Sequence, residues 1–410
     1  MTTDNFSWRR NLYAATAATF IGFTGFTLVM PFLPLYFEQL GLTDVGEIAL
    51  WSGLSLGVTP AITAFMAPLW GRLADRYGRK IMVQRSLISF VFIMGAMAFV
   101  SRPWHVFALR AVQGIFAGYG ALALTMAADS APKEQTAYAI GFVQTAQRLG
   151  PALGPVIGGV VAQAVGLRRA FFVTAAFYAL AAILMGIAYD ERKGVKRPGE
   201  GDRTVRVSFK NILAFENFIL LMVVVFGLQL VDRSFGPVLP LFVGELGAND
   251  RTVPLVSGLL FSIAAGTAAF GNQLCGRFLQ RHSARSVIAT TCGVAGVGVA
   301  GFLLTSSAWW LALPTALFGA GIGAATTAAY TAATVVIPTA ARGAGFGLLT
   351  TASLVGLAVS PIASGLLGAT SIRAVFAVDA VILGALAIFV KRLMITDPLP
   401  KVATPAPEEL

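Results

Sequence analysis

The stretch at 141–159 reads GFVQTAQRLGPALGPVIGG, and its glycines and prolines decide how the rest of the chain is interpreted. Gly150, Gly154 and Gly158 recur every four residues, so a helix stacks them into one nearly bare stripe that another backbone can approach closely. The two prolines each remove a backbone donor and bend a helix. A soluble helix rarely tolerates so many breakers, whereas neighbouring helices support them in a membrane. The stretch therefore predicts a kinked, tightly docked transmembrane helix.

The composition of the whole chain favours the same class of protein. Of 410 residues, 56% are hydrophobic and only 12% are charged, and the mean hydropathy is +0.76, far from the values of soluble proteins. About twenty apolar residues span a bilayer. The sequence predicts an all-α membrane protein with twelve transmembrane helices, at about 11–37, 47–70, 80–101, 103–127, 138–162, 168–189, 216–243, 252–275, 284–306, 308–333, 343–368 and 371–391.

The basic residues are distributed unevenly between the two sides of the predicted membrane. The net charge is +11, but 22 of the 30 Lys and Arg fall on one side, 5 on the other and 3 inside helices. This bias is the positive-inside rule, and it predicts cytoplasmic termini in a multi-pass protein of the cell's inner or plasma membrane. Topology therefore accounts for the basic loops, and we expect no nucleic-acid partner.

The chain also repeats itself at an offset of 205–206 residues. VMPFLPLYFEQLG at 29–41 matches FGPVLPLFVGELG at 235–247, and Pro155 corresponds to Pro361. Such a period indicates a duplicated unit with its substrate site between the copies, near the membrane midplane. We expect two pseudo-symmetric six-helix bundles at 1–189 and 216–392, a cytoplasmic linker at 190–215 and a cytoplasmic tail at 393–410.

Three motifs resemble those of the major facilitator superfamily. GRLADRYGRK at 71–80 resembles the hallmark loop between helices 2 and 3, and RAVQG at 110–114 resembles the helix 4 motif. The antiporter motif of helix 5 is matched at Gly141, Gly150, Gly154, Pro155, Gly158 and Gly159. The segments SWRRNL and LVMPFLPLYFEQLG look like those of MdtG-type multidrug resistance proteins. The resemblance covers essentially the whole chain.

This resemblance implies a member of the twelve-helix drug:proton antiporter branch. The expected function is proton-coupled secondary active transport that exports lipophilic small molecules by alternating access, that is, multidrug efflux and antibiotic resistance. The alternative is an exporter of one defined metabolite, such as a sugar or an amino acid. The expected partners are small lipophilic substrates, protons and membrane lipid, and we expect a monomer.

The loop at 71–80 combines glycines with charges of both signs. We expect Gly71 to permit close packing where its helix ends and Gly78 to permit a tight turn. Asp129 lies where the fourth helix reaches the cytoplasm, so an Asp75–Arg79–Asp129 cluster is expected. The resemblance implies that this region latches the two halves together, and the latch residues would be Gly71, Asp75, Arg76, Gly78, Arg79 and Asp129. The alternative is that these charges only fix the topology.

Three charged residues inside predicted helices are candidates for proton coupling: Arg110, Asp232 and Asp379. An uncompensated charge is costly in a membrane, so Arg110 should face a water-filled cavity or an acid, unless it extends to the nearby surface. A carboxylate that alternates between an apolar site and an arginine can gain and lose a proton. Asp232 is the first candidate, with Arg233 pointing about 100° away. Either aspartate could instead form a structural ion pair.

A second set of residues is expected to line the substrate cavity. Arg148 lies in the middle of helix 5 with Gln144 one turn earlier, so it would contact an anionic substrate or an acid, or else form a structural interhelix pair. Aromatic and methionine side chains suit lipophilic ligands. The predicted lining is Phe26, Met30, Gln113, Gln144, Arg148, Gln229 and Tyr330.

The sequence lacks the patterns that would indicate an enzyme. GLSLG at 53–57 satisfies the G-x-S-x-G pattern but lies in an apolar helix, not at a strand-to-helix turn. His105 and His282 are the only histidines and fall on opposite sides of the predicted membrane. We therefore predict no catalytic residues, no metal site and no cofactor.

Overall fold

The computed structural model describes residues 3–132, 135–191, 215–249, 251–337 and 342–394, and no strand occurs among them. Nearly all of the predicted linker and tail lie outside these residues. The first half contains α1 (Thr3–Leu28), α2 (Leu33–Gln39), α3 (Val45–Tyr77), α4 (Arg79–Met97), α5 (Pro103–Phe116), α6 (Tyr119–Ser130), α7 (Thr136–Val165) and α8 (Leu167–Ala188). The second half contains α10 (Phe218–Glu245), α11 (Val253–Leu279), α12 (Ala284–Leu304), the 3-10 turn η2 (Ala308–Leu311), α13 (Ala312–Val336), α14 (Arg342–Gly368) and α15 (Ile372–Leu393).

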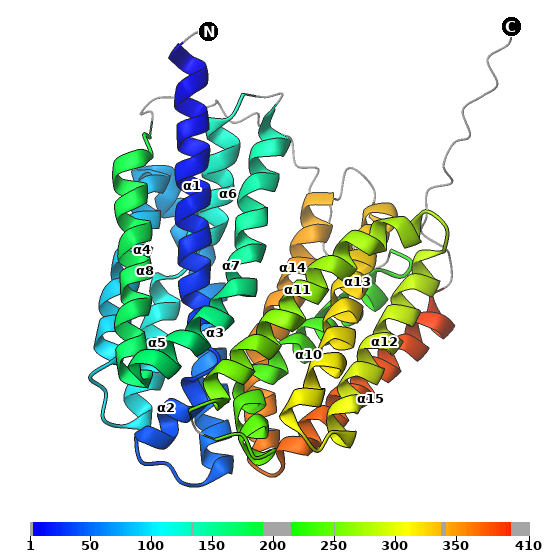
Figure 1. Cartoon of the computed structure of the whole chain (residues 1–410). Helices are drawn as coiled ribbons and strands as arrows, with labels where there is room; N and C mark the ends of the chain where they lie inside the picture. Colours follow the sequence, from blue (N-terminus) through cyan, green and yellow to red (C-terminus); the bar gives the residue numbers. More distant parts are fainter. Residues whose placement is uncertain (1–2, 133–134, 192–214, 250, 338–341, 395–410) are drawn as a thin grey trace, which may run out of the picture.

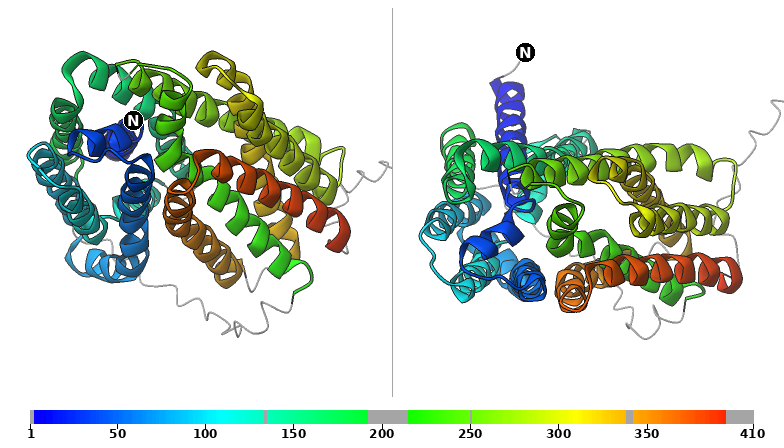
Figure 2. Two further views of the ribbon diagram at one scale, coloured as in Figure 1. Left: turned by 90° about the horizontal axis from the view of Figure 1, so that it is seen from below. Right: turned by 60° about the horizontal axis from the view of Figure 1, so that its bottom comes forward.

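The helices form two bundles that lie side by side, α1–α8 in one and α10–α15 in the other (Figures 1 and 2). Among the described residues, nine helices are long and apolar enough to cross a membrane, and the bent pair α1–α2 adds a tenth span. The pair α5–α6 and the 30-residue α7 complete twelve helical passes. The predicted twelve-helix fold in two pseudo-symmetric bundles is confirmed.

Two passes of the first half are broken where their counterparts in the second half are continuous. α1 and α2 meet at an angle of 47°, and Pro31 lies in the turn between them. α10 instead continues through Pro237 and Pro240. α5 ends just before Gly118, whose φ of +116° is left-handed. Gly323, at the corresponding place in the second half, lies inside the continuous helix α13. It packs closely against the backbone of α11.

The most extensive contacts between the halves are made by two symmetry-related helix pairs, α3 with α14 and α7 with α11, and α10 adds smaller contacts with α2 and α3. A Cβ at Gly365 would lie 2.7 Å from the carbonyl oxygen of Ala49, and a Cβ at Gly159 would lie 2.5 Å from that of Pro254. Similarly, Gly53 has no room for a Cβ against Pro361. Only glycine allows backbones this close. We call these glycine contacts, with Gly258 on Pro155 as the fourth, the seam.

The seam lies at one end of the molecule. Gly46, at the start of α3, contacts Ala369, just after α14, so this is the end at which α3 begins and α14 ends; we call it the closed end. Toward the opposite end, where α1 begins, the helices of the two bundles diverge (Figure 1). We call this the open end. Because the number of passes is even, α15 also ends on the side where α1 begins.

Candidate functional site

Two adjoining cavities lie between the halves on the open-end side of the seam. The first, of about 530 Å³, is lined by the first part of α7 and the last part of α11, including Gln144 and Gln273. The second, of about 350 Å³, is lined by α11, α13 and α14 of the second half together with Arg148. Arg148 lines both cavities, so it stands where they meet. A small molecule in either cavity would contact both halves at once.

Arg148 connects the two halves across this space. The side-chain amide of Asn272 on α11 forms hydrogen bonds through both its oxygen and its nitrogen when the oxygen faces Arg148. That oxygen then lies 3.1 Å from Nη1 of Arg148, and the amide nitrogen lies 2.9 Å from Oγ1 of Thr327. The guanidinium is exposed and keeps further donors directed at the cavities. The prediction that Arg148 is a cavity residue agrees with this placement, and its partner is an amide instead of an acid.

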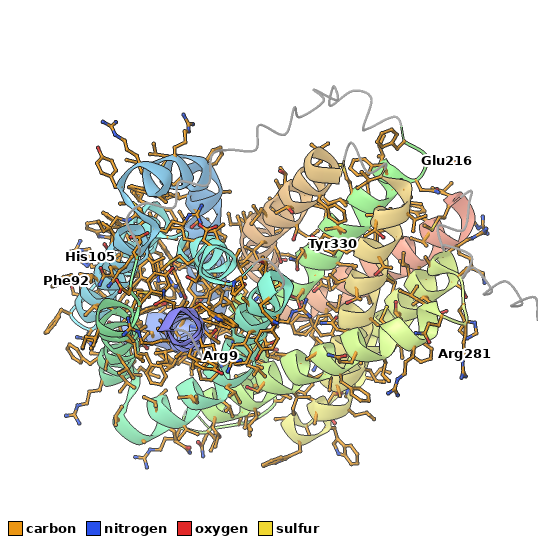
Figure 3. The ribbon with its side chains drawn as sticks, turned by 90° about the horizontal axis from the view of Figure 1, so that it is seen from above. Arg9, Phe92, His105, Glu216, Arg281 and Tyr330 are labelled. Atoms are coloured by element: carbon orange, nitrogen blue, oxygen red, sulfur yellow. The ribbon has the colours of Figure 1, made fainter. Side chains whose placement is uncertain are left out.

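The other predicted lining residues are divided between several places. Tyr330 lines the second cavity, stacked on Phe346 with ring centroids 6.5 Å apart, and it lies near the centre of the view in Figure 3. Phe26 is 37% exposed, and the methyl of Met30 approaches Gly236 of α10 across the halves. Neither residue lines the two cavities. Gln229 donates to Oγ of Ser353 at 2.8 Å, which holds it against α14.

The glycine stripe of α7 packs inside the first half. Cβ atoms at Gly150, Gly154 and Gly158 would collide with the backbone of α1 between Phe20 and Leu28. These three glycines of the motif therefore pack within the first half and not against the second. Gly159 follows one residue later, about 100° around the helix, and it alone among them meets α11. The stripe thus fixes α7 to its own bundle, and the adjacent face meets the other bundle.

The candidate proton carriers do not come together. Asp232 and Arg233 are adjacent on α10 and therefore about 100° apart around the helix, as predicted, but their side chains pair, with Nε of Arg233 3.2 Å from Oδ2 of Asp232. The Asp232 side chain is 30% exposed, and it lies one turn from Gly236 on the face of α10 toward the first half. Asp379 is 4% exposed, inside the second half, and hydrogen-bonds to the hydroxyl of Ser234.

Arg110 and Gln113 lie in the interior of the first half. Arg110 is 3% exposed and Gln113 is fully buried, and Nη1 of Arg110 donates to Oε1 of Gln113 at 3.0 Å. No ion pair of Arg110 occurs in the described part of the chain. The predictions that Arg110 faces a water-filled cavity or an acid, and that Gln113 lines the substrate cavity, are therefore wrong for this conformation. The guanidinium of Arg110 lies within electrostatic range of Tyr178 on α8.

The charged segment at 71–80, predicted as a loop, forms the last turns of α3, the turn at Gly78 and the start of α4, and it is tied to its own half at the open end. Gly78 has a φ of +100°, so the predicted tight turn is confirmed. Arg79 pairs with Asp129 on α6 and also donates to the carbonyl of Thr125 at 3.3 Å. The guanidinium of Arg76 lies over the ring of the adjacent Tyr77. The side chain of Asp75 lies outside the described residues.

Two further features of this loop differ from the sequence analysis. Open space surrounds Gly71, so the prediction that it permits close packing is wrong for this conformation. Glu191, which follows α8, was not singled out, yet its Oε1 accepts from the backbone nitrogens of Arg79 at 2.7 Å and Lys80 at 3.3 Å. A carboxylate at the start of α4 satisfies unpaired N–H groups and complements the helix dipole. The partner is 112 residues away, so no local pattern indicated it.

Comparisons with known proteins point to one family. The model of the Major Facilitator Superfamily matches residues 15–352 and 221–410. The chain is 31% identical over 319 residues to multidrug resistance protein MdtG of Proteus mirabilis, covering 77% of this chain and 78% of that protein. It is 33% identical over 290 residues to a multi-drug resistance efflux pump PmrA homologue of Lactococcus lactis, covering 70% of each.

Solved structures share the fold at lower identity. A bacterial homologue of the human lysosomal transporter Spinster, in an inward-facing and unoccupied conformation, superposes with a TM-score of 0.75 and 18% identity, over 95% of this chain and 98% of that chain. A D-xylose-proton symporter gives a TM-score of 0.74 at 12% identity, over 96% and 99% of the two chains. Both likenesses support the two-bundle architecture.

Proposed function

Because the chain belongs to the major facilitator superfamily, we propose that this multi-pass membrane protein exports lipophilic small molecules, several drugs among them, in exchange for protons. The observation that carries the proposal is the seam together with the two cavities that both halves line on its open-end side. A site that both halves line, closed toward one membrane face and open toward the other, suits alternating access. The named multidrug resistance relatives support export of drugs.

The charge distribution supports a cytoplasmic open end. The side that carries 22 of the 30 Lys and Arg is the side of the open end, including the loop at 71–80. In this orientation both termini lie in the cytoplasm of a cell whose inner or plasma membrane holds the protein. The conformation is then inward-open, and it is ready to take a substrate from the cytoplasm or the inner leaflet.

Proton coupling is proposed for Asp232 first. Its carboxylate is partly exposed, faces the first half and has Arg233 within ion-pair distance. Movement of the halves would change both its hydration and its distance from that arginine, and this change alters its affinity for a proton. Asp379 is sealed in this conformation and takes second place. Arg110 lies beside neither aspartate, so its part in coupling stays a prediction.

The latch and the moving bodies are proposals of the same kind. The Arg79–Asp129 pair keeps the loop at 71–80 in a fixed position at the open end. When that end closes, the loop would meet the second half and, with Asp75, hold it. The bundles at 1–189 and 216–392 would move as two bodies joined by the linker at 190–215. The protein would act as a monomer, because each bundle finds its partner within one chain.

Transport into proteoliposomes under an imposed pH gradient tests the proposal. The purified protein should move lipophilic compounds against their own concentration gradient, driven by the proton gradient, and this movement should stop when an ionophore collapses the proton gradient. Uphill transport that persists without a proton gradient, or no transport across a chemically broad panel, would contradict the proposal.

A second candidate is export of one defined metabolite, and the polar lining of the second cavity favours it. Besides Arg148 and Asn272, four threonines line this cavity: Thr326, Thr327, Thr331 and Thr334. Such a lining suits a ligand with an acidic or carbonyl group. Dye accumulation in cells with and without the protein separates the candidates. Exclusion of unrelated dyes favours multidrug export, and saturable transport of a single polar compound favours the metabolite.

A further inference from the structure

Four hydrogen-bond donors gather inside the first half without any acceptor. In the described part of the chain, no partner exists for Nε of Arg110, Nε2 of Gln113 or the hydroxyls of Tyr119 and Tyr178. The four residues are 3%, 0%, 6% and 0% exposed. Each of these atoms can donate a hydrogen bond, and a buried donor without an acceptor destabilises a fold. Four such donors in one bundle indicate an acceptor that the chain itself does not supply.

The four groups belong to one cluster. Arg110 and Gln113 are joined by the 3.0 Å hydrogen bond on α5. The guanidinium lies within electrostatic range of Tyr178 of α8, and Tyr178 lies within the same range of Tyr119 of α6. The rings of both tyrosines flank Phe90 of α4, with centroid distances of 5.1 Å for Tyr178 and 6.1 Å for Tyr119. Three helices, α5, α6 and α8, therefore direct donors toward the same interior region, beside Phe90 of α4.

Helix α1 covers one side of this region, and two of its glycines leave space for the rings of Tyr119 and Tyr178. A Cβ at Gly22 would lie 2.9 Å from the hydroxyl of Tyr119, and one at Gly25 would lie 3.7 Å from the ring of Tyr178. The two glycines place the rings against the backbone of α1, which offers no free N–H or C=O in mid-helix. The cluster is therefore enclosed on the side of α1, and it is separate from the cavities that Arg148 lines.

The charge of the cluster decides what it can hold. The guanidinium is the only formal charge among the four groups, and the ion pairs of the described residues involve other arginines: Arg10, Arg79 and Arg233. A buried, uncompensated cation in a membrane bundle is costly. A metal ion would add to that charge. A water molecule could accept hydrogen bonds but would leave the charge uncompensated.

We propose that Arg110, Gln113, Tyr119 and Tyr178 bind a small monovalent anion of the halide class inside the first half. The anion accepts from the four donors and neutralises the guanidinium. The second half supports this assignment by contrast. Thr315 stands at the place of Arg110, and it donates to its own helix at the carbonyl of Leu311. The second half therefore has no arginine at this place, and the need for an anion at Arg110 does not depend on what the protein transports.

Thermal unfolding of the purified full chain tests the proposal without a transport assay. At constant ionic strength, replacing gluconate by chloride or bromide should raise the unfolding midpoint in a saturable way, because an ion that binds only the folded state stabilises it. Tyr178→Phe keeps the ring and removes one donor to the anion. The half-saturating chloride concentration should rise about tenfold, as for loss of one charge-assisted hydrogen bond.

Tyr36→Phe is the matched control, because the buried hydroxyl of Tyr36 already donates to the carbonyl of Met97 at 2.6 Å. This variant should unfold at a lower temperature and respond to chloride as the unmodified protein does. Crystals of the unmodified protein grown in bromide should show anomalous scattering beside Arg110, a readout that needs no variant to fold. Equal midpoints in gluconate and chloride, or water alone in place of bromide, would overturn the proposal.

Discussion

Replacement of Gly365 by alanine should weaken the seam and shift the protein away from the conformation described above. The new Cβ would lie 2.7 Å from the backbone oxygen of Ala49 and 2.9 Å from Cα of Gly53. Both are main-chain atoms, so no side chain can rotate aside, and α3 and α14 must separate by about 0.5–1 Å. Overpacking of this kind costs about 1–3 kcal/mol. This cost applies only while the seam is closed. The equilibrium between the closed and the separated seam should therefore shift about 5- to 150-fold toward the separated form.

Spin-label distances between Arg169→Cys on α8 and Trp309→Cys on η2 would measure this shift. Both positions are exposed and belong to the closed end of different halves. In Gly365→Ala the population with the longer distance should grow. Gly347→Ala is the matched control on α14, since open space surrounds Gly347, and it should leave the distribution unchanged. Equal distance distributions in Gly365→Ala and Gly347→Ala would show that the glycine contact at Gly365 does not hold the closed end together.

Three further substitutions test other parts of the account. Arg148→Gln should raise the KM for acidic substrates about tenfold, as for loss of a charge-assisted hydrogen bond, while neutral substrates are little affected; equal effects on both would argue against substrate contact. Asp232→Asn should abolish uphill transport driven by a pH gradient but retain downhill exchange, and retained uphill transport would remove Asp232 from coupling. Glu191→Ala should lower the stability of the fold by about 1 kcal/mol through loss of the cap on α4, measured as a lower unfolding midpoint; an unchanged midpoint would contradict the capping role.

The helices and the duplication could be predicted from the sequence because they depend on local composition and on one constant offset. Apolar runs of membrane length and the match between 29–41 and 235–247 need no three-dimensional information. The turn at Gly78 was also predictable, since a glycine between two helical patterns commonly adopts a positive φ. The positions of Arg148 and Tyr330 at the cavities followed from residue type and depth in the helix.

What the sequence could not provide is which neighbour each helix face meets. Periodicity showed that Gly150, Gly154 and Gly158 share a face, but not that this face meets α1 instead of the other half. The seam glycine at Gly53 lay in a pattern that resembles a hydrolase motif, and its contact is more than 300 residues distant in sequence. Arg110 is buried in the interior of the first half within electrostatic range of Tyr178 on α8, a neighbour that no local pattern indicates.

Distances across both ends of one molecule test the central claim most directly. One label pair would join Tyr138 and Arg281, which are exposed near the open end of the two halves, and the other would join Arg169 and Trp309 at the closed end. Alternating access predicts opposite changes during turnover: the first distance shortens as the second lengthens, in the same molecules. Two distances that change together, or a closed end that never separates while substrate is transported, would contradict the account.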